Sequence, residues 1–155
     1  AGVEEALLEK LLDGAGLTSY PKLTGGKGLH VVARLKPAAD WDRAKAFCHA
    51  VASTLAGERP ERYTSTASKA GRGGRIFVDY LRNARGATSV APYSVRARPG
   101  APVAVPVRWG DLSRLDAPNA YTMANLPSRL AHLRGEPWAG YFEATQTLPT
   151  GVASP

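Results

Sequence analysis

The sequence predicts an α+β domain in which helices pack on a mixed or antiparallel sheet. The predicted elements run in the order helix, β-hairpin, helix, strand, extended segments and then helices, without the strict alternation that builds a parallel sheet. The chain has 155 residues, of which 44% are hydrophobic, which is enough for one domain with a buried core. We place this domain at residues 1–147 and expect residues 148–155 to form a tail or linker.

The first half of the chain contains the clearest elements. Apolar residues at helical spacing predict a helix over 3–13, and two glycines end it. Strands at 19–23 and 29–35 flank the glycine-rich stretch 24–28, which predicts a hairpin with the glycines at its bend. A second helix is predicted over 40–56, because one of its faces is apolar and its first residue is an aspartate suited to the N-cap.

The second half is less regular. The stretch 60–74 is rich in glycine, serine and threonine and predicts a mobile loop, and 75–80 predicts a strand. The remaining predicted elements are two extended segments that contain prolines, followed by two helices: 88–98, 103–109, 126–133 and 136–146.

The charge of the chain favours a polyanionic partner. The net charge is +7, and the stretch 60–98 holds eight basic residues against two acids. Such a local concentration is expected for a protein that binds nucleic acid or nucleotide triphosphates. The basic residues are Arg62, Lys69, Arg72, Arg75, Arg82, Arg85, Arg96 and Arg98.

Other features of the composition exclude several classes of protein. The single cysteine, Cys48, rules out an internal disulfide and a cysteine-based zinc cluster. His49 and His132 lie in predicted helices, and we interpret them as packing or surface residues because no His/Cys spacing indicates zinc. The sequence has neither an apolar run of membrane-spanning length nor a basic signal peptide, so we expect no membrane partner and a cytoplasmic location.

The glycine-rich turn is a candidate phosphate site. Its glycines allow close backbone approach to a phosphate, and Lys22, Lys27 and His30 add positive charge or hydrogen-bond donors. It is not a Walker A loop, since Gly28 follows the lysine and the required spacing is absent. The alternative is an ordinary hairpin turn with a lysine that faces solvent.

Asp79 is the candidate metal ligand. It follows a short apolar stretch of strand character and is surrounded in sequence by arginines. A carboxylate can hold Mg²⁺ or Mn²⁺ while guanidinium groups hold phosphate oxygens. The alternative is an acid that only pairs with a neighbouring arginine.

Arg96 and Arg98 form a third candidate feature. They alternate along an extended segment, so both are expected on one face, roughly 6–7 Å apart. That spacing suits successive phosphates. The alternative is an edge strand whose charges prevent aggregation.

Taken together, three stretches resemble the polymerase domain of bacterial DNA ligase D, a member of the archaeo-eukaryotic primase family. They are 24–32 (TGGKGLHVV), 72–83 (RGGRIFVDYLRN) and 91–103 (APYSVRARPGAPV). The similarity runs in order from about residue 1 to residue 146. The resemblance implies a primase-polymerase-like fold with a mixed or antiparallel sheet flanked by helices.

The resemblance also implies a function. Such a domain would add nucleotides, often ribonucleotides, to primer ends by metal-dependent nucleotidyl transfer during non-homologous end joining. It implies two Mn²⁺ or Mg²⁺ ions, DNA with 5′-phosphorylated ends or gaps, NTP or dNTP substrates, a Ku-type partner, attached ligase or nuclease domains, and a location at the bacterial nucleoid.

Residue roles follow from the same resemblance. Asp79 would be catalytic and would hold metal, and Thr24 stands where the family usually has serine. We assign nucleotide or phosphate binding to Thr24, Lys27, His30, Arg82, Arg96 and Arg98. We assign DNA binding to Lys22, Lys69, Arg72, Arg75 and Arg85.

One departure from the family pattern affects the predicted activity. The family carries an Asp-x-Asp motif on a strand before the helix with which this sequence opens, and no such motif precedes that helix here. We therefore expect the domain to be incomplete at its N-terminus. The alternative function is a catalytically incomplete fragment that binds DNA or nucleotide, and a basic domain with neither role is the remaining possibility.

Overall fold

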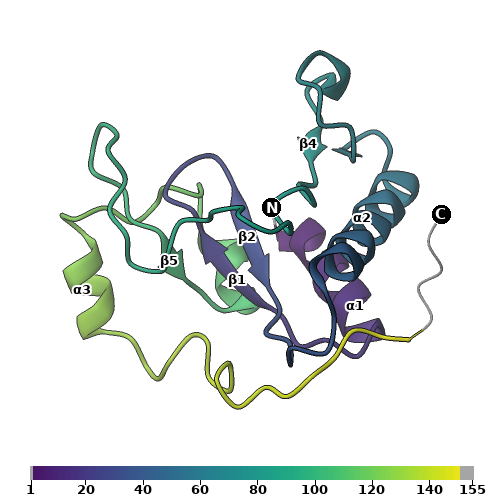
Figure 1. The fold of residues 1–155 in the computed structure, drawn as a ribbon. Coiled ribbons are helices and arrows are strands. Elements are labelled where there is room, and N and C mark those ends of the chain that lie inside the picture. The colour runs from purple at the N-terminus through teal and green to yellow at the C-terminus, as the bar shows by residue number, and fades with distance from the viewer. Residues whose placement is uncertain (1, 151–155) are drawn as a thin grey trace.

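A three-stranded antiparallel sheet lies at the centre of the protein (Figure 1). The computed structural model describes residues 2–150, with side chains from residue 6 onward. The strand order is β2-β1-β5, with β1 at Tyr20–Leu23, β2 at Leu29–Val32 and β5 at Val105–Pro106. The predicted α+β class is thus confirmed.

The β1–β2 hairpin forms as predicted, with the glycine-rich turn at its bend. Its register places Tyr20 opposite Val32 and Leu23 opposite Leu29. Strand β5 pairs with the other edge of β1, so that Leu23 also lies opposite Val105. Strand β1 is therefore the central strand, and its four residues are all buried.

Two helices lie beside the hairpin (Figure 1). Helix α1 spans Gly2–Gly14 and helix α2 spans Trp41–Glu58. Asp40 caps α2 as predicted, because its side-chain oxygen accepts a hydrogen bond from the Arg43 amide at 2.8 Å. Among residues 2–150, no helix combines the length and the apolar character needed to cross a bilayer.

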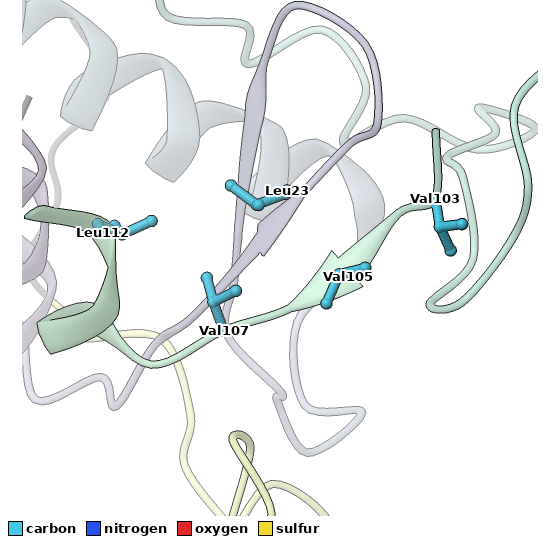
Figure 2. Packing of buried hydrophobic residues seen from close by; sticks show 5 residues of the cluster. All are labelled: Leu23, Val103, Val105, Val107 and Leu112. Carbon is cyan, nitrogen blue, oxygen red and sulfur yellow. The ribbon is translucent and has the colours of Figure 1, made fainter. Parts of the chain in front are cut away.

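Two hydrophobic clusters stabilise this arrangement. One joins β1 to the segment around β5 and contains Leu23, Val103, Val105, Val107 and Leu112 (Figure 2). The other joins the helices to the C-terminal part of the chain and contains Leu12, Leu17, Phe47 and Leu148, with Cys48 packed against it. Burial in this second cluster raises the pKa of the Cys48 thiol to about 11.

The predicted loop 60–74 contains structure that the sequence did not indicate. Strand β3 spans Tyr63–Thr64, and a 3₁₀-helix, η1, spans Ala70–Arg72. The strand predicted over 75–80 is reduced to β4, Ile76–Phe77, which pairs with β3 in parallel. The pair closes a lobe that projects from the end of α2 (Figure 1). We call 59–77 the basic lobe.

The segments after the basic lobe are mostly irregular. Extended segments around 95 and 103 meet in an antiparallel bridge, Val95 to Val103, as a second hairpin. A 3₁₀-helix, η2, spans Trp109–Arg114 and packs against α1. Helix α3, predicted over 126–133, spans Leu126–Ala131.

The helix predicted over 136–146 is wrong. Gly140 has a φ of 82°, which a right-handed helix excludes. Trp138 packs on β1 instead, where its Nε1 donates to the Pro21 carbonyl at 2.8 Å. Arg34 donates to the carbonyls of Phe142 and Ala144, each at 2.7 Å, so these carbonyls are satisfied without helical bonds.

The predicted tail contributes to the core at its beginning. Leu148 is buried against Leu12, Leu17 and Phe47. The rest of the predicted tail, 151–155, lies outside the described residues.

Candidate functional site

The glycine-rich turn is closed by its own threonine. Thr24 Oγ1 donates to the Gly28 carbonyl at 2.6 Å and accepts from the amides of Gly26 and Gly28, each at 3.3 Å. The Gly25 amide donates to the Pro118 carbonyl at 3.1 Å. These three amides therefore hold the shape of the turn and are not available to a phosphate. The turn instead supports the side chains around it.

The second hairpin brings two arginines to this turn. Arg96 Nη1 lies 3.5 Å from the Thr24 carbonyl. A Cβ on Gly25 would lie 3.0 Å from Arg96 Cγ, and one on Gly26 would lie 3.8 Å from Arg98 Cζ. Glycine is thus required at Gly25 for the hairpin to approach. The two arginines do not alternate along a strand as predicted, because the Arg98 amide donates to the Arg96 carbonyl at 2.8 Å and the chain bends between them.

His30 lies on β2 near the same turn and is half-buried. Burial lowers the pKa of its imidazole below the ordinary value, and the positive charges of Lys22, Arg96 and Arg82 lower it further. The negative charge of Asp79 opposes them. These influences require the four charged groups to lie near the ring. At neutral pH the ring is therefore neutral and can either donate or accept a hydrogen bond.

Asp79 lies at the edge of this cluster, two residues after β4. Its Oδ1 accepts a hydrogen bond from the Leu81 amide at 3.0 Å. Its Oδ2 lies 3.8 Å from Arg82 Nε, and 41% of the carboxylate side chain remains exposed. The ion pair that formed the alternative interpretation is therefore present, but it is long and solvent-accessible and leaves oxygen lone pairs available.

Lys22, which was predicted to bind DNA, is not on the surface. It lies opposite His30 on β1 and is buried. Its ammonium group donates to the Val90 carbonyl, and burial lowers its pKa. Lys22 thus ties β1 to the segment after the basic lobe. Its positive charge also lowers the pKa of the neighbouring His30.

Two arginines of the basic lobe use their side chains within the lobe itself. Arg75 donates to the carbonyls of Arg72 and Gly71, each at 2.9 Å, and to that of Pro60 at 3.3 Å. Arg72 stacks on the Phe77 ring at 4.4 Å and donates to the Ala67 carbonyl. Both therefore hold the lobe together.

Three other basic residues of the predicted set lie on the surface. Lys27 at the glycine-rich turn, Lys69 in the basic lobe and Arg85 after it are exposed. Exposure leaves their charges accessible to phosphate groups.

The described residues do not form a metal centre by themselves. Within 2–150, no group of three or more His, Cys, Asp or Glu side chains is placed to hold a metal ion. The one Asp-x-Asp triplet of the sequence, Asp40–Asp42, does not substitute for the family motif, because Asp40 caps helix α2 and does not lie on a strand. Asp79 can contribute one carboxylate to a metal, but a two-metal site needs several.

Comparison with known protein families identifies the family to which the chain belongs. Residues 3–138 match the model of the primase-polymerase domain of LigD. The chain belongs to the LigD primase-polymerase family. The resemblance noted in the three sequence stretches is thereby confirmed over most of the chain.

Curated LigD proteins are similar over nearly the whole chain. The multifunctional non-homologous end joining protein LigD of Pseudomonas aeruginosa is 45% identical over 143 residues, which is 92% of this chain and 17% of that protein. The bifunctional protein LigD of Bacillus subtilis is 31% identical over 143 residues, or 92% of this chain and 23% of that protein. The chain thus spans roughly a fifth of the length of these relatives.

A solved structure confirms the fold. The polymerase domain from Mycobacterium tuberculosis ligase D, in complex with DNA, superposes with a TM-score of 0.81 at 28% identity. The match covers 94% of this chain and 50% of that one. The LigD fold therefore contains about as much structure again beyond the part that matches here.

Two backbone carbonyls that hold the site in place leave no signal in the sequence. The Pro118 carbonyl fixes Gly25, and the Val90 carbonyl fixes Lys22. Backbone carbonyls carry no residue-type signal, so no motif could have revealed these contacts. His49, predicted to be a packing or surface residue, contacts the ring of Tyr80 next to Asp79.

Proposed function

We propose that this LigD-family chain provides the nucleotide-binding side of a repair polymerase, which adds nucleotides, often ribonucleotides, to primer ends during non-homologous end joining. The observation that carries the proposal is the convergence of His30, Asp79, Arg82 and Arg96 from three separate segments beside the glycine-rich turn. A half-buried imidazole among four charged groups is unusual in a purely structural role.

The chemistry of these residues suits a triphosphate. Arg96, Arg98 and Arg82 would neutralise phosphate oxygens, and guanidinium groups can do this through paired hydrogen bonds. Neutral His30 would donate a hydrogen bond to a phosphate oxygen without adding charge. Lys27 would add an exposed positive charge at the turn. Together they would orient the α-phosphorus toward a primer 3′-hydroxyl, which is the main protein contribution to phosphoryl transfer.

Asp79 would hold Mn²⁺ or Mg²⁺ as one oxygen donor. When bound, these ions neutralise the charge that develops on the transferring phosphate. The described residues fit this role only in part, because no second carboxylate accompanies Asp79. We therefore assign Asp79 a share in holding metal and assign no further step to the ions.

DNA with 5′-phosphorylated ends or gaps is the proposed macromolecular substrate. Support comes from the exposed charges of Lys69 and Arg85, the net charge of +7, and the DNA complex of the similar M. tuberculosis domain. Arg72 and Arg75 would act on DNA through the shape of the lobe and not by direct contact, and Lys22 would act through its hold on the segment that carries Val90. A Ku-type partner, linked ligase or nuclease domains and a nucleoid location are proposed because the curated relatives are end-joining proteins.

Primer extension tests the proposed polymerase function. The substrate is a gapped, 5′-phosphorylated duplex with ribonucleotides and Mn²⁺, and the variants are Asp79→Ala and, as a matched control, the exposed carboxylate Asp116→Ala. In a version of the domain that also carries the upstream Asp-x-Asp motif, we expect extension by the wild type and by Asp116→Ala and its loss in Asp79→Ala. Equal extension by both variants would refute the role of Asp79.

A second candidate function is binding of DNA or nucleotide without turnover. It is favoured by the absence of a three-ligand metal group within the described part of the chain. Salt-sensitive binding of the same duplex with no extension under any metal would support this alternative.

A further inference from the structure

A ring contact joins helix α2 to the turn that carries Asp79. The rings of His49 and Tyr80 have centroids 4.3 Å apart and planes inclined at 35°. Both residues are half-buried. Contacts between rings at such distances stabilise a structure beyond the area that they bury.

The hydrogen bonds around Asp79 fix the shape of the turn but not its place on the molecule. Asp79 accepts from the Leu81 amide, and the Tyr80 carbonyl accepts from the Asn83 amide at 3.3 Å. These bonds, like the ion pair with Arg82, begin and end within 79–83.

The turn meets the rest of the protein on two sides. The Val78 amide donates to the Thr64 carbonyl at 3.0 Å, but Thr64 belongs to the short β3–β4 pair of the basic lobe. The Tyr80 ring lies on His49, and α2 is anchored two residues earlier by Phe47 in the second hydrophobic cluster. Of the two supports, the 18-residue helix is the more rigid.

We propose that His49 is a positioning residue, which sets the place of the Asp79 carboxylate beside His30 and Arg96 through its ring contact with Tyr80. This inference rests on the proposed function, in which Asp79 holds a metal ion. His49 does not touch the nucleotide or the metal. A loss of the stack would let the turn move relative to β2 while its internal hydrogen bonds re-form and break more often.

Solvent exchange of the Leu81 amide, measured by NMR on the whole chain, tests the inference. In His49→Ala we expect this amide to exchange about two- to twelvefold faster, the factor that the coupling free energy of an aromatic pair implies. In His49→Phe, which keeps a ring, we expect the wild-type rate. The Arg43 amide, which is bonded to Asp40 at the start of the same helix, serves as an internal reference and should not change.

Two further variants separate positioning from general destabilisation. His132→Ala removes a histidine at the end of α3 and should leave the Leu81 amide unaffected. Tyr80→Ala should accelerate the Leu81 amide as His49→Ala does, and the double variant should add nothing further, because both changes remove one contact. An unchanged Leu81 rate in His49→Ala, an equal acceleration at Arg43, or additive effects in the double variant would each overturn the inference.

Paramagnetic broadening separates this inference from the proposed function. Added Mn²⁺ should broaden the amides of Leu81 and Arg82 in the wild type and not in Asp79→Asn, and His49→Ala should weaken the broadening. An absence of broadening in the wild type would count against Asp79 as a metal ligand. The exchange rates would still decide whether His49 positions the turn.

Discussion

At the scale of single residues, the site depends on groups that are partly removed from water. His30 is held neutral by burial and by three positive neighbours, and Lys22 is buried beneath it. Gly25 is the one turn position at which two segments leave no space for a side chain. Each of these features has a measurable consequence.

Acid should destabilise the fold in part through His30. Its pKa in the folded chain lies below its unfolded value of about 6.5, so the unfolded chain takes up a proton first as the pH falls. The stability that neutral His30 contributes is therefore complete at high pH and decreases as the pH drops from about 6.5 through the folded pKa. Urea unfolding at pH 8 and pH 5 should show a larger decrease for the wild type than for His30→Gln. Equal decreases would contradict this prediction.

Substitution of Gly25 should be costly. Its φ is 65°, and an added Cβ would lie 3.0 Å from the carbon and the oxygen of the Val103 carbonyl. Backbone strain alone costs about 1–2 kcal/mol for Gly25→Ala, and the close contact adds to it. Gly28→Ala is the matched control, because nothing lies within 4 Å of its added Cβ. Chemical denaturation measures both, and similar losses in the two variants would show that the approach of Val103 is unimportant.

At the scale of elements, the structure could be predicted where the signal was local. The hairpin was predictable from its glycine bend and α2 from its apolar face and Asp40 cap. The Asp79–Arg82 pair lies within one turn, so its proximity was also visible in the sequence. The burial of Lys22 depends on a carbonyl 68 residues later, which no local pattern contains.

Contacts with residues far away in the sequence also explain the elements that were predicted wrongly. The predicted helix over 136–146 does not form, and Trp138 and Tyr141 pack on Tyr20 instead, at ring distances of 5.8 Å and 5.3 Å. Strand β3 forms only because β4 pairs with it, and a two-residue strand has no periodicity of its own.

Substitutions in the basic lobe should distinguish the residues that stabilise it from those that contact DNA. Arg75→Ala removes three hydrogen bonds to carbonyls, so we expect a loss of about 1–3 kcal/mol in stability. Lys69→Ala should leave stability unchanged and weaken duplex binding, with the salt dependence of binding reduced by about one phosphate contact. Denaturation and binding titrations at several salt concentrations check both. A Lys69→Ala variant with an unchanged salt dependence would exclude this lysine from the DNA interface.

At the scale of the whole molecule, the two ends of the described chain share one core. Leu148 packs with Leu12, Leu17 and Phe47, although the sequence suggested that the domain ends at residue 147. The C-terminal segment is further held by Arg34 and Arg43, which donate to its carbonyls. The described segment 137–150 therefore belongs to the fold even though it contains no helix or strand.

Truncation of Leu148 should reveal this dependence. Leu148→Ala removes a buried side chain from the second hydrophobic cluster, and we expect a loss of about 2–4 kcal/mol in the free energy of unfolding. Thr147→Ala, at the exposed neighbouring position, should change it by less than about 0.5 kcal/mol. Equal stability of the two variants would restore residue 147 as the boundary of the fold.

The pairing of Thr18 with Gln146 has a consequence for how the protein folds. These residues exchange two hydrogen bonds, each of 2.8 Å, across a sequence separation of 128 residues. A ribosome adds roughly 5–20 residues each second, so several seconds would pass between the synthesis of the β1–β2 hairpin and that of its last partners. Loop closure over such distances makes the folding step itself slow compared with that of local helical proteins. The nascent chain would therefore expose the apolar face of β1 until these later partners have emerged.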